Sequence, residues 1–218
     1  MSRPSGGRRV LLLEGRDDLM VVENLRKSHG MPETFSLVDQ GGIEPLLEGL
    51  PALVGPGSGN THVGVLVDAD THLERRWQAV RDILKRAGYT DLPQVPVQDG
   101  SIHTPPDRSQ PTVGVWLMPN NQLPGMLEDF VAMLVPQDDA LWPRALAAVE
   151  AIPEEHRRFA AAHTAKARIH TWLAWQERPG TPMGAAINQR YLASGCPEAN
   201  SFVGWLRRLF PETPPGHS

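Results

Sequence analysis

Acidic side chains follow two of the apolar segments that the sequence predicts to be strands. Glu14 comes directly after Val10–Leu13, and Asp68 and Asp70 follow an apolar run that ends at Val67. Side chains two apart in an extended segment point to the same side, so both aspartates could reach one cation. An all-oxygen, partly hydrated site is what Mg²⁺ or Mn²⁺ prefers. The residue types and their spacing therefore indicate a divalent-cation site.

Further carboxylates stand close to these in the sequence. Asp18 is four residues after Glu14, a spacing that brings the two together if the first helical turn has formed by Asp18. Glu128 and Asp129 follow a later strand and a PNN turn. Each aspartate has a simpler explanation, because aspartates commonly cap helices and complement the helix dipole. Glu14 is harder to explain in this way, since a glutamate that closes a buried strand costs desolvation energy unless it is paired.

The elements that must position these residues alternate between strand and helix. Compact apolar runs bounded by charge or glycine predict the strands, and apolar stripes of helical period predict the helices between them. The strands are expected at 8–14, 34–39, 62–67 and 112–118, and the helices at about 17–29, 43–50, 73–87 and 126–134. This order predicts an α/β fold over 8–135, with a mostly parallel four-stranded sheet flanked by helices. Ligands bind at the carboxyl ends of such strands, where the carboxylates fall.

The pattern changes in two other parts of the chain. Residues 90–112 contain five prolines, which favours a long irregular excursion or a loose hairpin. Beyond Pro136 the sequence predicts a helical extension over 136–210 that packs on the sheet domain, followed by a frayed tail at 211–218. The helices of this extension are expected at 142–152, 154–176, 183–193 and 200–210.

Composition limits the classes of function. The 218 residues carry a formal net charge of −4, so any surface that binds nucleic acid must be local. The single Cys196 excludes an internal disulfide and a thiolate metal cage, which favours a cytoplasmic protein and leaves metal binding to carboxylates and imidazoles. No apolar run approaches the roughly 20 residues that cross a bilayer, and Val10–Leu13 is too short for an export signal, so no membrane partner is expected.

Two motifs together resemble a known domain. LLLEGRDD at 11–18 and VGVLVDAD at 63–70 resemble the Toprim domain, whose signature is a glutamate-glycine after the first strand and a DxD after a later one. Toprim domains occur in topoisomerases, DnaG-type primases, recombination proteins and the OLD (overcoming lysogenization defect) nucleases. The runs VGVWLMPNNQLPGMLEDF at 113–130 and AKARIHTWLAW at 165–175 look like a small bacterial Toprim family of unassigned function that is related to the OLD nucleases.

The resemblance covers roughly 8–176 and implies metal-dependent phosphodiester chemistry with Mg²⁺ or Mn²⁺. It makes Glu14 a metal ligand or general acid/base, and Asp68 and Asp70 metal ligands. Asp18 matches the second acidic position of the nuclease-type members, and Glu128 would complete a second metal site. The chain has no Walker loop and therefore lacks the ATPase part of OLD proteins.

Lys166 matches the C-terminal lysine of OLD-like nucleases, where it would offset charge in the transition state. A solvated helix lysine is the ordinary alternative. Basic pairs such as Arg75-Arg76, Arg157-Arg158 and Arg207-Arg208 could surround the acidic centre and hold a phosphate backbone, or simply form exposed helix faces.

Two functions remain open from the sequence. The first is a nuclease that acts on DNA or RNA. The second is a non-catalytic Toprim-fold module that binds a metal, a nucleotide or a protein partner. Neither reading fixes whether the chain associates with itself.

Overall fold

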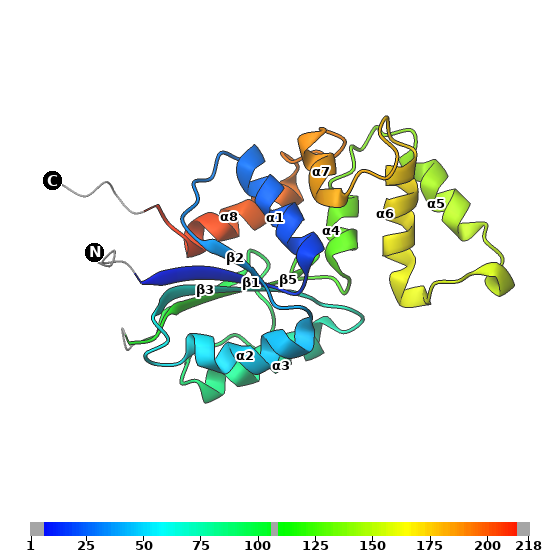
Figure 1. The fold of residues 1–218 in the computed structure, drawn as a ribbon. Coiled ribbons are helices and arrows are strands. Elements are labelled where there is room, and N and C mark those ends of the chain that lie inside the picture. Colours follow the sequence, from blue (N-terminus) through cyan, green and yellow to red (C-terminus); the bar gives the residue numbers. More distant parts are fainter. Residues whose placement is uncertain (1–6, 106–108, 213–218) are drawn as a thin grey trace.

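The computed structural model describes residues 7–105 and 109–212, which form an α/β fold around a five-stranded, mostly parallel sheet (Figure 1). The strand order is β2-β1-β3-β5-β4, and β4 alone is antiparallel to its neighbour. The strands are β1 (Arg8–Leu13), β2 (Ser36–Asp39), β3 (Asn60–Asp68), β4 (Ser101–His103) and β5 (Thr112–Met118). The α/β prediction is confirmed, but the predicted number of strands is one too low.

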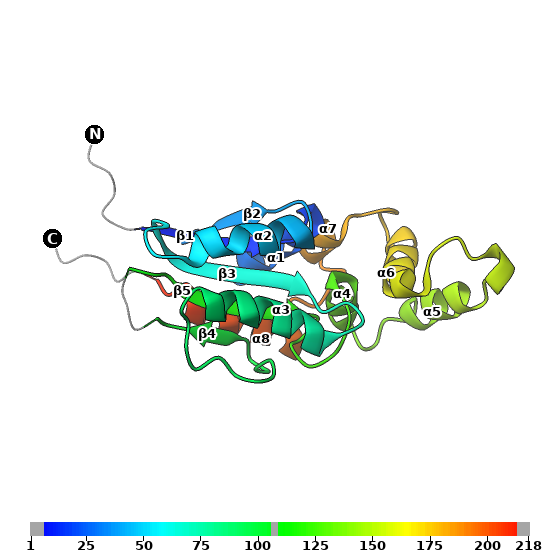
Figure 2. The same cartoon turned by 90° about the horizontal axis from the view of Figure 1, so that it is seen from below.

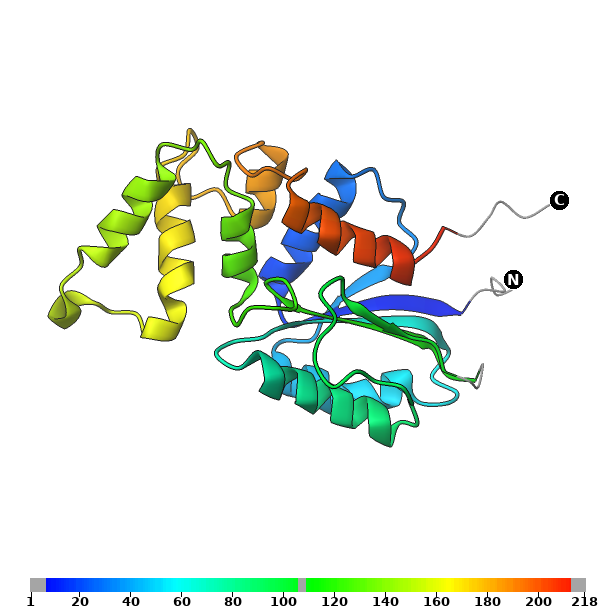
Figure 3. The same cartoon turned by 180° about the vertical axis from the view of Figure 1, so that it is seen from behind.

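Helices cover both faces of this sheet (Figures 1 and 2). Helices α2 (Ile43–Val54) and α3 (Leu73–Arg86) lie on one face. The other face carries α1 (Arg16–Ser28), α4 (Leu127–Met133), α7 (Met183–Asn188) and α8 (Pro197–Leu209). The last two helices come from the predicted extension and pack beside α1 in this layer (Figure 3).

Burial on both faces explains why the strands are continuous apolar runs rather than alternating ones. In β1, Leu11 and Leu13 belong to the core beneath α1 and α8, whereas Leu12 belongs to the core beneath α2 and α3. In β3, Leu66 belongs to the core beneath α1 and α8, and Val65 belongs to the core beneath α2 and α3. All five side chains are at most 1% exposed, so these strands are fixed in register by two cores at once.

A projecting arm extends beyond the carboxyl ends of the strands (Figures 1 and 2). We define the arm as residues 142–174, which comprise α5 (Trp142–Glu150), α6 (Thr164–Ala174) and the segment between them. Trp142 and Trp172 pack edge to face within it, and Trp172 Nε1 donates a hydrogen bond to Asp139 Oδ1 at 3.0 Å. These tryptophans, with Ala145, Ile169 and Leu173, join the arm to the core beneath α1 and α8.

The additional strand, β4, lies in the proline-rich region at 90–112. Its three residues pair with Val113–Val115 of β5, and Trp205 Nε1 of α8 donates to the Ser101 carbonyl at 3.2 Å. A strand this short has no periodicity to read, and its position depends on contact with a helix about 100 residues later in the chain. Of the two expectations for 90–112, a long irregular excursion or a loose hairpin, the hairpin agrees better with the antiparallel pairing of β4 and β5.

The single helix predicted at 154–176 is wrong. The chain forms two 3₁₀ turns, Glu154–His156 and Ala161–His163, before α6 begins at Thr164. Residues 153–163 have no buried side chain, so a continuous helix there would have no apolar face to pack. Within the predicted tail only Pro211 and Glu212 are described, and 213–218 lie outside the described residues.

The contact between α7 and α1 gives a test of the fold. A Cβ on Gly184 would lie 2.6 Å from the Met20 carbonyl oxygen of α1, an atom that cannot move aside cheaply. We expect Gly184→Ala to destabilise the chain by roughly 1–3 kcal/mol through overpacking. The melting temperature should fall by about 2–4 °C per kcal/mol. Gly195→Ala is the control, because no atom lies within 4 Å of its added Cβ. Equal melting temperatures for the two variants would contradict this packing.

Candidate functional site

A cleft of about 590 Å³ opens where the carboxyl ends of β1, β2 and β3 meet α4 and the arm. Strand ends and helix N-termini converge here, as in other open parallel sheets. The cleft is lined by all six site residues expected from the sequence: Glu14, Asp18, Asp68, Asp70, Glu128 and Lys166. Residues from elements far apart in the sequence thus share one cavity.

Glu14 joins the ends of two neighbouring strands. Its Oε1 accepts a hydrogen bond from the Asp68 backbone N–H at 2.8 Å. Burial raises the pKa of the Glu14 carboxyl above its usual range, although this hydrogen bond and the charge of Arg76 oppose the shift. A glutamate in this position holds its proton more tightly than an exposed glutamate does.

Asp68 and Asp18 are the most strongly perturbed carboxyls of the cleft. Burial, followed by the charges of Asp18, Glu14 and Glu128, raises the pKa of Asp68 to about 9. Its Oδ1 accepts the Leu127 N–H at the start of α4, at 2.9 Å. Burial and the charge of Glu14 raise the pKa of Asp18 to about 7, and Asp18 Oδ2 accepts the Gly15 N–H at 3.2 Å. These shifts show that the carboxylates lie close enough to repel one another.

Glu128 and Lys166 form an ion pair across the cleft. Lys166 Nζ of α6 lies 3.0 Å from Glu128 Oε1 of α4. The Glu128 side chain is only 5% exposed, whereas the Lys166 side chain is 50% exposed. The hydrogen bond to Glu128 raises the pKa of Lys166, so the ammonium stays charged. The Lys166 ammonium is thus turned toward the acidic centre. The sequence alone does not predict that Glu128 is its partner.

Asp70 lies differently from the sequence expectation. Strand β3 ends at Asp68, and Asp70 has a φ of 52°, so the two aspartates do not share an extended segment. The backbone of Asp70 instead exchanges two hydrogen bonds with Gly125, of 2.8 and 2.7 Å. Its carboxylate pairs with Arg76 of α3 and is half exposed. Asp70 lines the cleft, but the geometric reason given for a shared cation with Asp68 is wrong.

The donor set has the chemistry of a site for a hard divalent cation. Glu14, Asp68 and Glu128 each use one carboxylate oxygen for a protein donor, and their second oxygens bond to no described residue. Such oxygens are suitable ligands for Mg²⁺ or Mn²⁺. Across 7–105 and 109–212, no three histidine, cysteine or acidic side chains are grouped as a ready-made metal cage. A bound cation would therefore have to draw these carboxylates together.

Several other residues at the cleft are not among the six site residues expected from the sequence. Arg16 and His163 line it from α1 and the arm, and Arg76 reaches it through its ion pair with Asp70. Arg76 is one of the basic pairs seen in the sequence, but nothing in its spacing singles it out. In contrast, Arg207 and Arg208 of α8 bond to backbone carbonyls of His29 and Asp99 and do not line the cleft.

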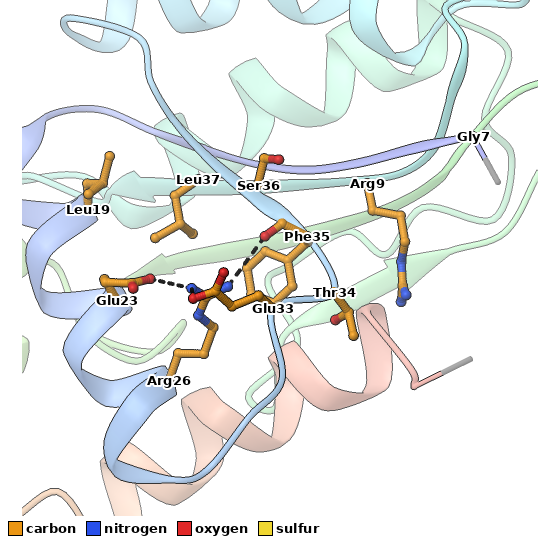
Figure 4. A pocket seen from close by; sticks show the side chains of 10 residues that line it. All are labelled: Gly7, Arg9, Leu19, Glu23, Arg26, Glu33, Thr34, Phe35, Ser36 and Leu37. Atoms are coloured by element: carbon orange, nitrogen blue, oxygen red, sulfur yellow. Dashed lines mark hydrogen bonds and ion pairs between the residues drawn. The ribbon is translucent and has the colours of Figure 1, made fainter. Parts of the chain in front are cut away.

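A second hollow, of about 480 Å³, lies between α1 and β2 (Figure 4). Arg26 lies 2.6 Å from Glu23 and 3.3 Å from Glu33, and its guanidinium also lies over the Phe35 ring. The charges of this hollow are matched within the protein. The acidic cleft differs because its carboxylates outnumber the cations beside them.

These features define a three-layer α/β protein with an acidic cleft at the carboxyl edge of its sheet. A family described as "Protein of unknown function (DUF3226)" matches residues 8–211, so the chain belongs to that family. No curated protein and no solved structure matches the chain. Within the described residues no helix has both the length and the apolar character needed to span a bilayer.

The raised pKa of Asp68 predicts a pH-dependent effect on stability. An acid whose pKa is about 9 in the folded chain and near 4 when unfolded loses stabilisation as pH rises between those values. An asparagine side chain at this position cannot ionise and can still accept the Leu127 N–H. We therefore expect Asp68→Asn to melt a few degrees above the wild type at pH 8 without divalent cations, and by a smaller margin at pH 5.

Asp70→Asn is the matched control for this measurement. Asp70 is half exposed and paired with Arg76, so its replacement should give no such stabilisation. A melting temperature for Asp68→Asn at or below that of the wild type at pH 8 would show that the Asp68 carboxylate is not destabilising.

Proposed function

We propose that this chain is a Toprim-type nuclease that hydrolyses phosphodiester bonds of DNA or RNA with Mg²⁺ or Mn²⁺. The observation that supports this best is the meeting of Glu14, Asp18, Asp68 and Glu128 in one open cleft, each close enough to affect the pKa of another. The glutamate-glycine after β1 and the DxD at the end of β3, the two motifs that resemble a Toprim domain, both line that cleft.

Each side chain has a role that follows from its surroundings. A divalent cation, when bound, would lower the pKa of a water molecule and offset charge on the phosphate. Glu14 and Asp68 have free oxygens to hold such a cation, and Glu14 would act either as a ligand or as the general acid/base. Lys166 places an ammonium at the solvent side of the same cleft, within reach of a phosphate oxygen.

Cationic side chains of the cleft and of the arm offer contacts for a polyanion in a chain of negative net charge. Arg16 lines the cleft and is exposed. Arg157 and Arg158 are exposed in the segment between α5 and α6, and Arg157 lies over the Phe159 ring. Phosphate contacts of this kind are local and need no overall positive charge.

A glutamine substitution tests the proposed chemistry. We expect Glu14→Gln to lower cleavage of plasmid, linear duplex or single-stranded substrates by at least about 10²-fold, because the amide cannot accept a proton or neutralise a cation. Glu48→Gln is the control, since Glu48 is exposed on α2 and does not line the cleft. Activity of Glu14→Gln within a few-fold of the wild type would rule out this role for Glu14.

A non-catalytic module that binds a metal, a nucleotide or a protein is the alternative function. It is favoured by the way each carboxylate already has a protein donor, most clearly Asp70 with Arg76. A rise in melting temperature with Mn²⁺, but no cleavage of any nucleic acid, would support the module over the nuclease.

Salt dependence distinguishes a nucleic-acid partner from other partners. We expect binding to DNA or RNA in Ca²⁺ to weaken with salt, with a slope near −0.9 per phosphate contacted on duplex DNA. Reversing the charge of Arg157 and Arg158 to glutamate should reduce that slope by about 1–2. Reversing Lys85 and Arg86, an exposed pair at the far end of α3, should not. A salt-independent affinity would favour a protein or small-molecule partner.

A further inference from the structure

The Lys166–Glu128 pair places a cation of the protein inside the acidic cluster. Glu128 is in the first turn of α4, and its side chain is almost completely buried. Lys166 Nζ, 3.0 Å away, is its only ion-pair partner among the described residues. Lys166 comes from the arm. The carboxylates of the cleft other than Glu128 come from the sheet edge and from α1.

Burial makes this pairing important for Glu128. A carboxylate removed from water is costly unless a nearby positive charge compensates it. The ammonium also feels the charges of Asp17 and Asp68, so it serves the cluster and not one residue alone. Lys166 therefore does for Glu128 what a second bound cation would otherwise do.

Two cations cannot share this position cheaply. Like charges a few ångströms apart repel one another more strongly near a protein surface than in bulk water, and a divalent ion doubles the repulsion that a monovalent ion would meet. Glu14 and Asp68 have no lysine or arginine of the described chain on their free oxygens, so a cation that binds there meets less competition.

We propose that Lys166 takes the place of a second divalent cation at Glu128, so that the cleft binds one ion tightly and a second only when Lys166 leaves. This inference rests on the proposed function, because it concerns how many metal ions the same cleft holds. The cleft would then hold one metal ion and one lysine ammonium. The ammonium and a second metal ion would compete for the position beside Glu128.

Metal stoichiometry tests the proposal without any assay of activity. The intact chain is titrated with Mn²⁺, and free Mn²⁺ is measured by its electron paramagnetic resonance signal. The wild type should bind one equivalent tightly. Lys166→Met should bind a second equivalent about ten-fold or more tightly than the wild type does, because the competing charge is gone.

The chain offers a matched control and a reversal. Lys27 pairs with Glu23 at 3.0 Å on α1, outside the cleft, so Lys27→Met removes a lysine–glutamate pair of the same length and should leave both affinities unchanged. Adding Glu128→Gln to Lys166→Met should remove the gained second site, since the amide carries no charge for the ion.

A thermal measurement gives a second readout. In EDTA, Lys166→Met should melt below the wild type, because Glu128 is left buried without a counter-charge. Excess Mn²⁺ should remove most of that difference. A Lys166→Met variant that melts as the wild type does under both conditions would contradict the role of Lys166 as counter-ion.

The outcomes separate this inference from the proposed function. Two tight equivalents in the wild type, or the same second-site affinity in Lys166→Met, would overturn the inference and leave a metal-dependent nuclease intact. No Mn²⁺ bound by either protein would overturn both. One equivalent in the wild type that Asp68→Asn does not weaken would place the metal elsewhere and also overturn both.

Discussion

The structure of the cleft depends on the burial of carboxylates at the edge of a parallel sheet. Because all the strands except β4 run the same way, their carboxyl ends meet, and Glu14 and Asp68 come together with little solvent around them. Their repulsion must be balanced by groups that donate hydrogen bonds or positive charge. The Asp68 and Leu127 N–H groups, Arg76 and Lys166 provide that balance. Much of the cleft can be understood as compensation for these charges.

Most of the fold can be predicted from the sequence because its main elements have strong local patterns. Strands β1, β3 and β5 each contain a continuous run of apolar residues and glycine, and helices α1, α2 and α3 each bury one apolar stripe. Strand β4 and residues 153–163 lack such patterns. The first is formed by contact with Trp205 of α8, and the second is exposed and forms only short turns. A tertiary contact decides the first, and the lack of any buried side chain decides the second.

For the site as well, the sequence predicts which residues come together but not how they pair. Residue types and strand ends are enough to predict that Glu14, Asp18, Asp68, Asp70 and Glu128 gather at one edge of the sheet, whereas Lys166 is expected there only from the resemblance to OLD-like nucleases. They do not predict which of these side chains pair with one another. The pairing of Asp70 with Arg76 follows from the backbone turn after β3, and that of Glu128 with Lys166 follows from the path of the arm. Charges attract over several ångströms, so their partners are chosen by the fold and not by sequence distance.

The arm and the sheet edge differ in how well they tolerate inserted residues. The cleft carboxylates are attached to buried strands and α1, where an inserted residue would shift the register of both cores. Residues 153–163 bury no side chain, and lengthening such a loop costs little free energy, about 0.6 kcal/mol for each doubling. Relatives can therefore differ in loop length here while they keep the same sheet edge. Of this loop only His163 lines the cleft, so a change in loop length would alter one wall of the cleft and leave its carboxylates in place.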